Sequence, residues 1–227
     1  MSDRLDEFLN KLDEAAEAIA LNLSRQYDQK NLAYGNNAHQ GFLKYGPISY
    51  IIRIEDKLNR LETLWSNPSI SKDDESIMDT IGDAISYCFM FIGSMTAETD
   101  NGSKYTNEEY TRQCFARNTD HSFVNCYIQA IRDYENEDLF YDKCFFDFVY
   151  YDEELIIKAV NLIKTQNPHQ YSGLIFVLAY RLLFLLALFR VDETMAKGLC
   201  DKFFVRPKGY ESRFDYWKKN HENKENV

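Results

Sequence analysis

The sequence lacks the short motifs by which several enzyme classes are recognised. It contains no GxxxxGK(S/T) phosphate-binding loop, no GxGxxG, no HExxH and no GxSxG. It also lacks any useful length of polar and apolar alternation, which is the pattern of a half-buried strand. Apolar residues recur instead at spacings of three and four, which predicts an all-α fold. The histidines are widely scattered and do not indicate a zinc site: His39, His121, His169 and His221.

Basic residues are fewer than acidic ones. The chain has 26 Lys and Arg against 36 Asp and Glu, a formal net charge of -10. Because this charge repels the phosphate backbone of nucleic acids, no nucleic-acid partner is expected. A smaller phosphate-bearing ligand would require a local cluster of basic residues or a bound cation. The composition, with 45% apolar and 15% aromatic residues, is that of a folded chain.

Cysteine is also scarce, and its pattern does not suggest disulfides. The five cysteines are odd in number, never form CxxC and lie within apolar stretches, as reduced core thiols do: Cys88, Cys114, Cys126, Cys144 and Cys200. The first ten residues, "MSDRLDEFLN", do not show the charged-then-apolar pattern of a secretion signal. We therefore expect a cytoplasmic protein.

The chain has one long apolar run, "GLIFVLAYRLLFLLALF", over residues 173–189. The run is short for a membrane span and carries Arg181 near its middle, so we expect a buried helix rather than a membrane segment. Since this helix is apolar on all sides, it could also bury a homodimer interface.

The expected helices divide the chain at its polar breaks. The region 1–204 is predicted to form a single all-α domain, with a core at 34–95 and additional helices at 107–204, followed by a polar tail at 205–227. Within the core, the Gly- and Asn-rich stretch 31–47 is expected to be a loop. Helices are expected at 3 to about 29, 47–64, from Asp73 or Asp74 to about 92, in short pieces from 107 to 167, from about 172 to 189, and at 193 to about 203.

Acidic residues form a stripe along the third expected helix. Glu75, Asp79 and Asp83 recur every four residues and therefore share one side of that helix. Met90 falls on the same side, which indicates that protein covers it. A carboxylate in such a place must be paired, protonated or bound to a cation, because an isolated buried charge is too costly.

The second expected helix carries another polar set. The side chains whose oxygens could bind a metal are Glu55, Asp56 and Asn59, and the basic residues are Arg53, Lys57 and Arg60. Carboxylates from two facing helices are suitable ligands for Mg²⁺, and the basic residues could hold phosphates that the metal also contacts. The alternative is that both acidic sets are solvated helix faces with ordinary ion pairs. Spacing alone leaves both interpretations open.

Two fragments carry a family resemblance. "GPISYIIRIEDKLNRLETL" followed by "DESIMDTIGDAISY" resembles the nucleotide modification associated domain 1 of phage and bacterial proteins, over residues 34–92. That family is similar to the MazG-like all-α NTP pyrophosphohydrolases, in which EExxE and ExxD motifs bind Mg²⁺ and a nucleoside triphosphate. Glu55 and Asp56 match the first motif, with Asn59 in place of its last acid. Asp83 matches the second, with Thr80 in place of its first acid.

The resemblance implies a metal-dependent (deoxy)nucleoside triphosphate pyrophosphohydrolase of phage or bacterial nucleotide metabolism, which uses Mg²⁺ or Mn²⁺ and releases a nucleoside monophosphate and pyrophosphate. Because that superfamily usually builds its four-helix core from two or more chains, it also implies a homodimer, in the cytoplasm of a bacterium or a phage-infected cell. The implied metal ligands are Glu55, Asp56, Glu75, Asp79 and Asp83, and all but Glu55 are also candidate catalytic groups. The implied phosphate-binding residues are Arg53, Lys57 and Arg60. In the segment "AYGNNAHQ", Asn36 and Asn37 could hydrogen-bond a base on which Tyr34 stacks, although Asn beside Gly also marks turns.

The end of the chain carries a second, gapped resemblance. "DKFFVRPKGYESRFDYWKKNHENKEN" is similar to the C-terminal motif of dimeric all-α dUTPases, which closes over substrate phosphates. This likeness makes Lys208, Gly209 and Tyr210 candidate substrate-binding residues, together with Arg206. Two other functions stay open from the sequence. One is a member of the same fold that binds a nucleotide or a protein without catalysis, and the other is a helical interaction protein.

Overall fold

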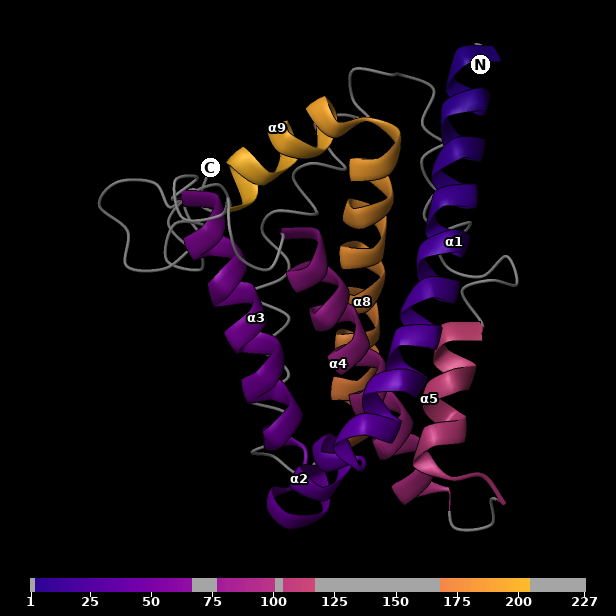
Figure 1. Ribbon diagram of the computed structural model, residues 1–227, viewed down its shortest axis with the longest axis vertical. Helices are drawn as coiled ribbons and strands as arrows, with labels where there is room; N and C mark the ends of the chain where they lie inside the picture. The colour runs from indigo at the N-terminus through magenta and orange to yellow at the C-terminus, as the bar shows by residue number, and fades with distance from the viewer. Residues whose placement is uncertain (1–2, 67–76, 101–103, 117–167, 205–227) are drawn as a thin grey trace, which may run out of the picture.

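The computed structural model describes residues 3–66, 77–100, 104–116 and 168–204, and within these ranges it contains helices and no strand. The predicted all-α class is therefore confirmed. Figure 1 shows the arrangement of the seven described helices, which are α1 Asp3–Tyr34, α2 Asn37–Tyr45, α3 Ile48–Ser66, α4 Ile77–Thr99, α5 Asn107–Ala116, α8 Pro168–Val191 and α9 Glu193–Phe204. The expected short helices at 117–167 and the polar tail at 205–227 lie outside the described residues.

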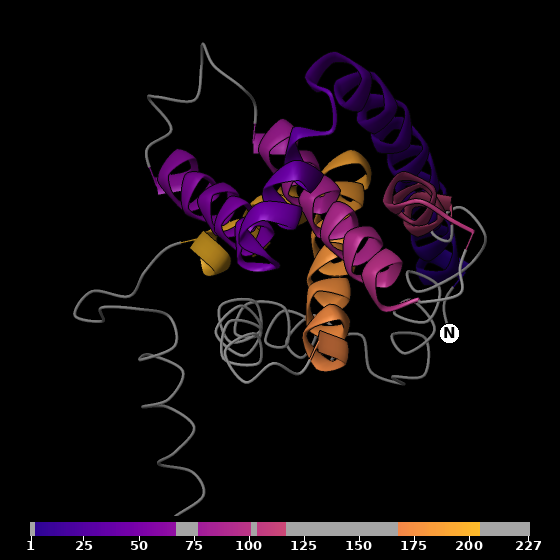
Figure 2. The ribbon, with the colours of Figure 1, turned by 90° about the horizontal axis from the view of Figure 1, so that it is seen from below.

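Helix α8 lies behind α4 in the view of Figure 1, and Figure 2 shows it on one side of α4, with α3 to its left and α1 to its right. It packs against α4, α1 and α9, and every residue from Leu178 to Leu188 is buried. The apolar run is thus a core helix, as expected, and no helix among the described residues is long and apolar enough to cross a membrane. Since the chain itself covers α8, its apolar composition no longer argues for a dimer interface, and the homodimer stays a prediction.

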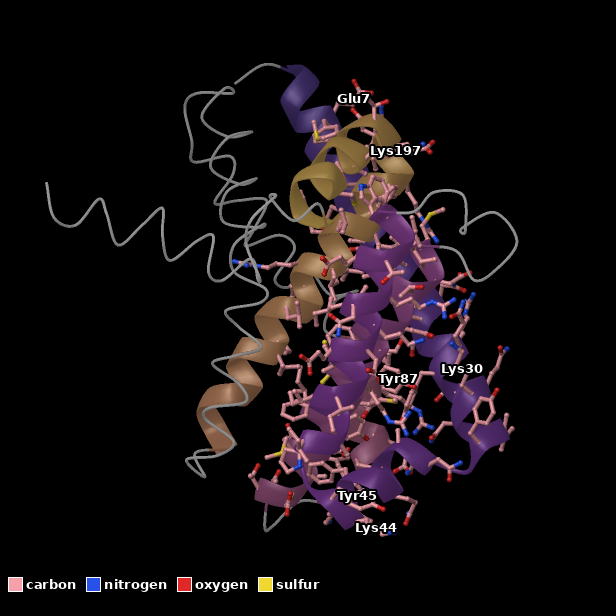
Figure 3. The ribbon with its side chains drawn as sticks, turned by 90° about the vertical axis from the view of Figure 1, so that its left-hand side faces the viewer. Glu7, Lys30, Lys44, Tyr45, Tyr87 and Lys197 are labelled. Carbon is pink, nitrogen blue, oxygen red and sulfur yellow. The ribbon has the colours of Figure 1, made fainter. Side chains whose placement is uncertain are left out.

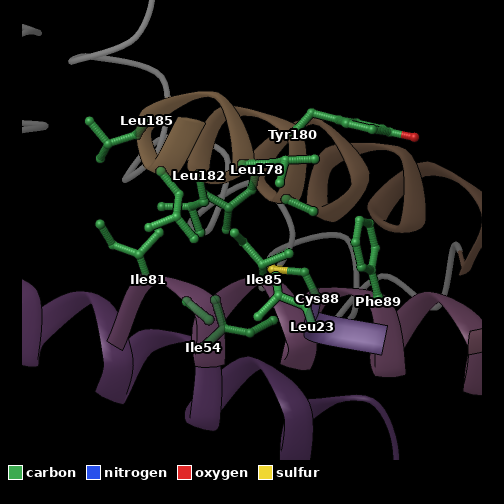
Figure 4. Packing of buried hydrophobic residues seen from close by; sticks show 14 of the residues in the cluster. Leu23, Ile54, Ile81, Ile85, Cys88, Phe89, Leu178, Tyr180, Leu182 and Leu185 are labelled. Carbon is green, nitrogen blue, oxygen red and sulfur yellow. The ribbon is translucent and has the colours of Figure 1, made fainter. Parts of the chain in front are cut away.

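The core is built where α4 and α8 face each other. Figure 4 shows Ile81, Ile85 and Phe89 of α4 directed toward Leu178 and Leu182 of α8. All five side chains are fully buried. Burying a side chain of this size contributes about 1.5–3 kcal/mol relative to leaving it exposed, so this contact is a main source of stability.

Helix α1 joins the core through the apolar stripe that its sequence predicts. Leu12, Ala16, Ile19 and Leu23 are buried at spacings of three and four. The stripe packs on α8, while Leu23 also approaches Gly82 of α4, where an added Cβ would lie 3.0 Å from the Leu23 Cδ2. The small residue in α4 therefore lets α1 and α4 come close together.

The predicted loop over 31–47 is wrong, because most of this stretch is helical. α1 continues to Tyr34, and only Gly35 and Asn36, with φ of 60° and 57°, separate it from α2, which runs to Tyr45. Both are residue types that tolerate the left-handed region, so two residues suffice for the turn. α2 then begins at once, and its apolar Phe42 is buried in the core. The turn places the end of α1 beside the beginning of α2.

The cysteines that the structure describes agree with their predicted environment. Cys88, Cys114 and Cys200 are buried in the core as thiols. Cys126 and Cys144 lie outside the described residues.

Candidate functional site

A cavity of about 460 Å³ lies where the end of α1 meets the beginning of α2, the first half of α3 and the middle of α4. Its volume is within the range of small-molecule sites. Figure 3 shows Lys30 and Tyr87 on this side of the molecule, above the α2 residues Lys44 and Tyr45. The lining residues are Gln26, Tyr27, Lys30, Asn31, Tyr34, Asn37, Ala38, Arg53, Asp83, Ser86, Tyr87 and Met90.

The polar centre of the cavity is Asp83, which two lysines contact from different helices. Lys30 Nζ of α1 donates to Asp83 Oδ1 at 2.7 Å, and Lys57 Nζ of α3 donates to Asp83 Oδ2 at 2.8 Å. Burial opposes ionisation of Asp83, but the hydrogen bonds from Lys30 and then Lys57 outweigh it and hold the pKa of the carboxyl below its usual value. Asp83 is therefore a carboxylate with both oxygens engaged. Of the three states expected for a covered acid on this side, which are paired, protonated or bound to a cation, the structure shows the paired one.

Arg53 brings a third positive charge to the same place. Its guanidinium lies over the Tyr87 ring, 5.6 Å from the centroid, and its Nη1 donates to the Tyr87 hydroxyl at 3.4 Å. Among the described lining residues, Asp83 is the only acid. Lys30, Lys57 and Arg53 thus outnumber it, and the cavity is locally basic in a chain of net charge -10.

Aromatic rings and amides complete the lining. Tyr34 is 67% exposed at the mouth of the cavity, whereas Tyr27 is buried. Gln26, Asn31 and Asn37 add side-chain amides, each of which both donates and accepts hydrogen bonds. These groups can stack on a planar ring and hydrogen-bond its edge, while the basic residues can hold an anion.

The predicted acids do not converge on this cavity. Asp79 lies one turn before Asp83 on α4 but is exposed and is not part of the lining. Glu55 and Asp56 of α3 are exposed too, because Ile51 and Ile54 turn toward the core and direct these neighbours to solvent. Glu75 lies outside the described residues.

The described residues do not fit a Mg²⁺ or Mn²⁺ ion. No group of three or more His, Cys, Asp or Glu within them is arranged to hold a metal. Asp83 is the one predicted ligand in the cavity, and both its oxygens face ammonium groups. The metal site that includes Glu75 stays a prediction, and no chemical step is derived through a metal here.

The predicted substrate-binding residues divide into three groups. Arg53 and Asn37 line the cavity, and Lys57 is not part of the lining but pairs with the lining residue Asp83. Arg60 is exposed and outside the lining, while Asn36 donates from its amide to Glu108 Oε1 of α5 and so fixes the turn before α2. Lys208, Tyr210, Gly209 and Arg206 lie outside the described residues.

Of the α1 residues at the cavity, the sequence predicts Tyr34 alone. Gln26, Lys30 and Tyr34 recur every four residues and form one polar row on its last turns, with Tyr27 and Asn31 beside them. This row has the spacing of an ordinary solvated face, so its position beside α4 could not be distinguished from the sequence. Tyr87 was overlooked for the same reason.

A second polar cluster lies between α2, α3 and α4, outside the cavity lining. His39 Nδ1 is 3.0 Å from Ser94 Oγ, and the Tyr50 hydroxyl is 3.1 Å from the same oxygen. Ser94 is 1% exposed, so no substrate can reach it. Burial lowers the pKa of His39 below its usual value and raises the pKa of Tyr50 to about 12. The cluster therefore holds neutral side chains and fastens α2 to the core.

Comparison of the chain with protein-family models, with curated proteins and with solved structures gave no match. The resemblance to the nucleotide modification associated domain 1 thus stays a prediction from the quoted fragments.

Proposed function

We propose that the cavity binds a nucleoside triphosphate. The observation that carries this proposal is a local basic cluster in a chain that is otherwise strongly acidic. Lys30 and Lys57 pair with Asp83, and Arg53 lines the same cavity. A local basic cluster is what a phosphate-bearing ligand needs in such a chain. The resemblance to nucleotide-metabolising proteins supports the same ligand class.

The phosphates are assigned to the basic side of the cavity. Lysine and arginine make charge-assisted hydrogen bonds to phosphate oxygens, and arginine can do so with two parallel bonds. Arg53 is already oriented by its contact with the Tyr87 ring and hydroxyl. Less side-chain entropy is therefore lost when it binds an anion.

The base is assigned to the side formed by α1 and α2. Tyr34 offers an exposed ring on which a base can stack, and Asn37 offers an amide for its hydrogen-bonding edge. This assignment keeps the roles that the sequence suggested for these two residues. Asn36 is not included, because its amide is directed to Glu108.

Binding is the part of the predicted function that the described geometry supports best. Pyrophosphate release, with Mg²⁺ or Mn²⁺ and in the cytoplasm of a bacterium or an infected cell, rests on the resemblance and the cysteine pattern. Asp83 is the predicted catalytic acid that lies in the cavity, which keeps hydrolysis as the second candidate. A homodimer and a non-catalytic interaction role remain further predictions.

The proposal is tested with a panel of ribo- and deoxynucleoside triphosphates, by thermal unfolding and by calorimetry. We expect at least one triphosphate to bind and to raise the unfolding temperature, and Arg53→Met to weaken that binding by about tenfold, since a hydrogen bond to a charged group contributes about 1.5–3 kcal/mol. Lys11→Met, an exposed change elsewhere on α1, is the matched control. Wild-type protein that binds none of the panel would contradict the proposal.

The same panel separates binding from catalysis. Pyrophosphate release is measured for wild type and for Asp83→Asn, with Mg²⁺ or Mn²⁺ present. Release by wild type that the variant loses would support hydrolysis, whereas binding without release would support the non-catalytic alternative.

A further inference from the structure

We infer that phosphate binding in this cavity is independent of a divalent metal, because Lys30 and Lys57 occupy the positions beside Asp83 where a metal would have to lie. This inference rests on the proposed function and deepens it. It names the form of the ligand as the metal-free polyphosphate anion. It also differs from what the family resemblance implies.

Both oxygens of the Asp83 carboxylate are already paired with ammonium groups. Lys30 Nζ lies 2.7 Å from one Asp83 oxygen and Lys57 Nζ lies 2.8 Å from the other. A metal bound to either oxygen would lie in contact with an ammonium group, and like charges repel strongly at that separation. Mg²⁺ also demands several oxygen ligands in octahedral geometry. Asp83 is the one acid among the described lining residues, so these residues offer a metal a single carboxylate.

A bound triphosphate requires positive charge around it, which either a metal or basic side chains can supply. In metal-dependent sites, Mg²⁺ neutralises part of the phosphate charge. Here two lysines and Arg53 supply positive charge at the same cavity, with one carboxylate against them. The side chains thus provide about the charge that a divalent ion would bring.

The two lysines differ in how far their side chains are exposed to solvent. The Lys30 side chain is 56% exposed and that of Lys57 is 20% exposed. Lys30 is therefore accessible to an incoming phosphate. Because an ammonium group carries three N–H donors, it can donate to that phosphate while it stays paired with Asp83. Asp83 acts as a positioning residue that keeps both ammonium groups at the cavity before the ligand arrives.

The experiment measures equilibrium binding by calorimetry with the full chain. The probes are inorganic tripolyphosphate and the nucleoside triphosphate panel, each titrated once in excess EDTA and once in excess MgCl₂. We expect binding in EDTA to be as tight as in MgCl₂ or tighter, because the metal complex carries less negative charge. Binding that requires MgCl₂ would overturn the inference and leave the proposed function standing. No binding in either buffer would overturn both.

Two variants sharpen this comparison. Lys30→Met is expected to weaken binding in EDTA by about tenfold and to fold normally, since Lys57 still pairs with Asp83. Lys11→Met on the same helix is the control and should bind as wild type does. Asp83→Asn is expected to weaken binding to the same extent in EDTA and in MgCl₂, because the carboxylate positions the two ammonium groups and holds no metal. If Asp83→Asn removed binding only in MgCl₂, a metal held by Asp83 would be indicated and the inference would be wrong.

Discussion

Asp83 and Lys57 join α4 to α3 through an ion pair of 2.8 Å in which both side chains are about one-fifth exposed. Lys30 extends the link to α1 through the other oxygen of the same carboxylate. Three helices thus meet at one charged group, and the cavity opens beside it. The ion pairs that hold these three helices together are therefore also part of the candidate site, so a change at Asp83 should affect both stability and binding.

Asp83→Asn is expected to lower the free energy of unfolding by about 1–2 kcal/mol, because two ammonium groups lose their charged acceptor and Lys57 is largely buried. Urea unfolding followed by circular dichroism measures the change. Glu193→Gln on α9 is the control, since its pair with Lys197 is exposed and such pairs contribute a few tenths of a kcal/mol. Equal effects of the two substitutions would show that the Asp83 network has no special role in stability.

Gly93→Ala is expected to destabilise the fold by about 1–3 kcal/mol, the usual cost of overpacking. A Cβ at this position of α4 would lie 2.7 Å from the backbone nitrogen of Thr111 in α5, and backbone cannot move aside as a flexible side chain can. Gly198→Ala on α9 is the matched control. Its Cβ would meet no atom within 4 Å, so the variant should be as stable as wild type or more stable by up to about 1 kcal/mol. A wild-type melting curve for Gly93→Ala would contradict the close packing of α4 and α5.

The stability of the protein is expected to fall as the pH drops below about 6.5, the usual pKa of histidine. Burial lowers the pKa of His39 in the folded state, although the charges of Glu108 and Glu98 partly oppose this effect. The unfolded chain therefore binds a proton first as the pH falls, and this proton favours unfolding. Urea unfolding of wild type and His39→Gln between pH 5 and 7.5 measures the effect. The free energy of unfolding of His39→Gln should depend less on pH than that of wild type. Identical pH profiles for the two proteins would contradict the role of His39.

Tyr87→Leu is expected to weaken nucleotide binding several-fold, whereas Tyr87→Phe should stay within about twofold of wild type. The ring orients Arg53, and the hydroxyl adds only a long hydrogen bond of 3.4 Å. Calorimetry with the tightest-binding triphosphate of the panel compares the two variants. If both lost affinity equally, the hydroxyl rather than the ring would be the important group.

Much of the fold follows from apolar spacing. The stripe of Leu12, Ala16 and Ile19 predicts α1, and the all-round apolar run predicts the buried α8. The predicted loop over 31–47 is wrong because Gly and Asn occur in two-residue turns as well as in long loops. In fact a two-residue turn at Gly35 and Asn36 is enough, and the burial of Phe42 stabilises a helix directly after it.

The site was only partly predictable, since spacing shows which residues share one helix face but not which faces meet. Asp83, Arg53 and Lys57 were identified because they lie on the expected faces of α3 and α4. Lys30 and Tyr87 were missed, as the contact between α1 and α4 depends on the packing of the whole core. Glu55 and Asp56 were placed at the site by motif, although the core contacts of Ile51 and Ile54 direct them to solvent.

The most direct test of the account is to observe the lysine ammonium groups themselves during a titration. In protein labelled with ¹⁵N-lysine, the Nζ signals of Lys30 and Lys57 are assigned with Lys30→Met and Lys57→Met, and the tightest-binding triphosphate is then added in EDTA. We expect both signals to shift in a saturable manner while that of Lys11 does not change. Saturable binding that leaves Lys30 and Lys57 unaltered would show that the ligand binds elsewhere and would contradict the assignment of this cavity.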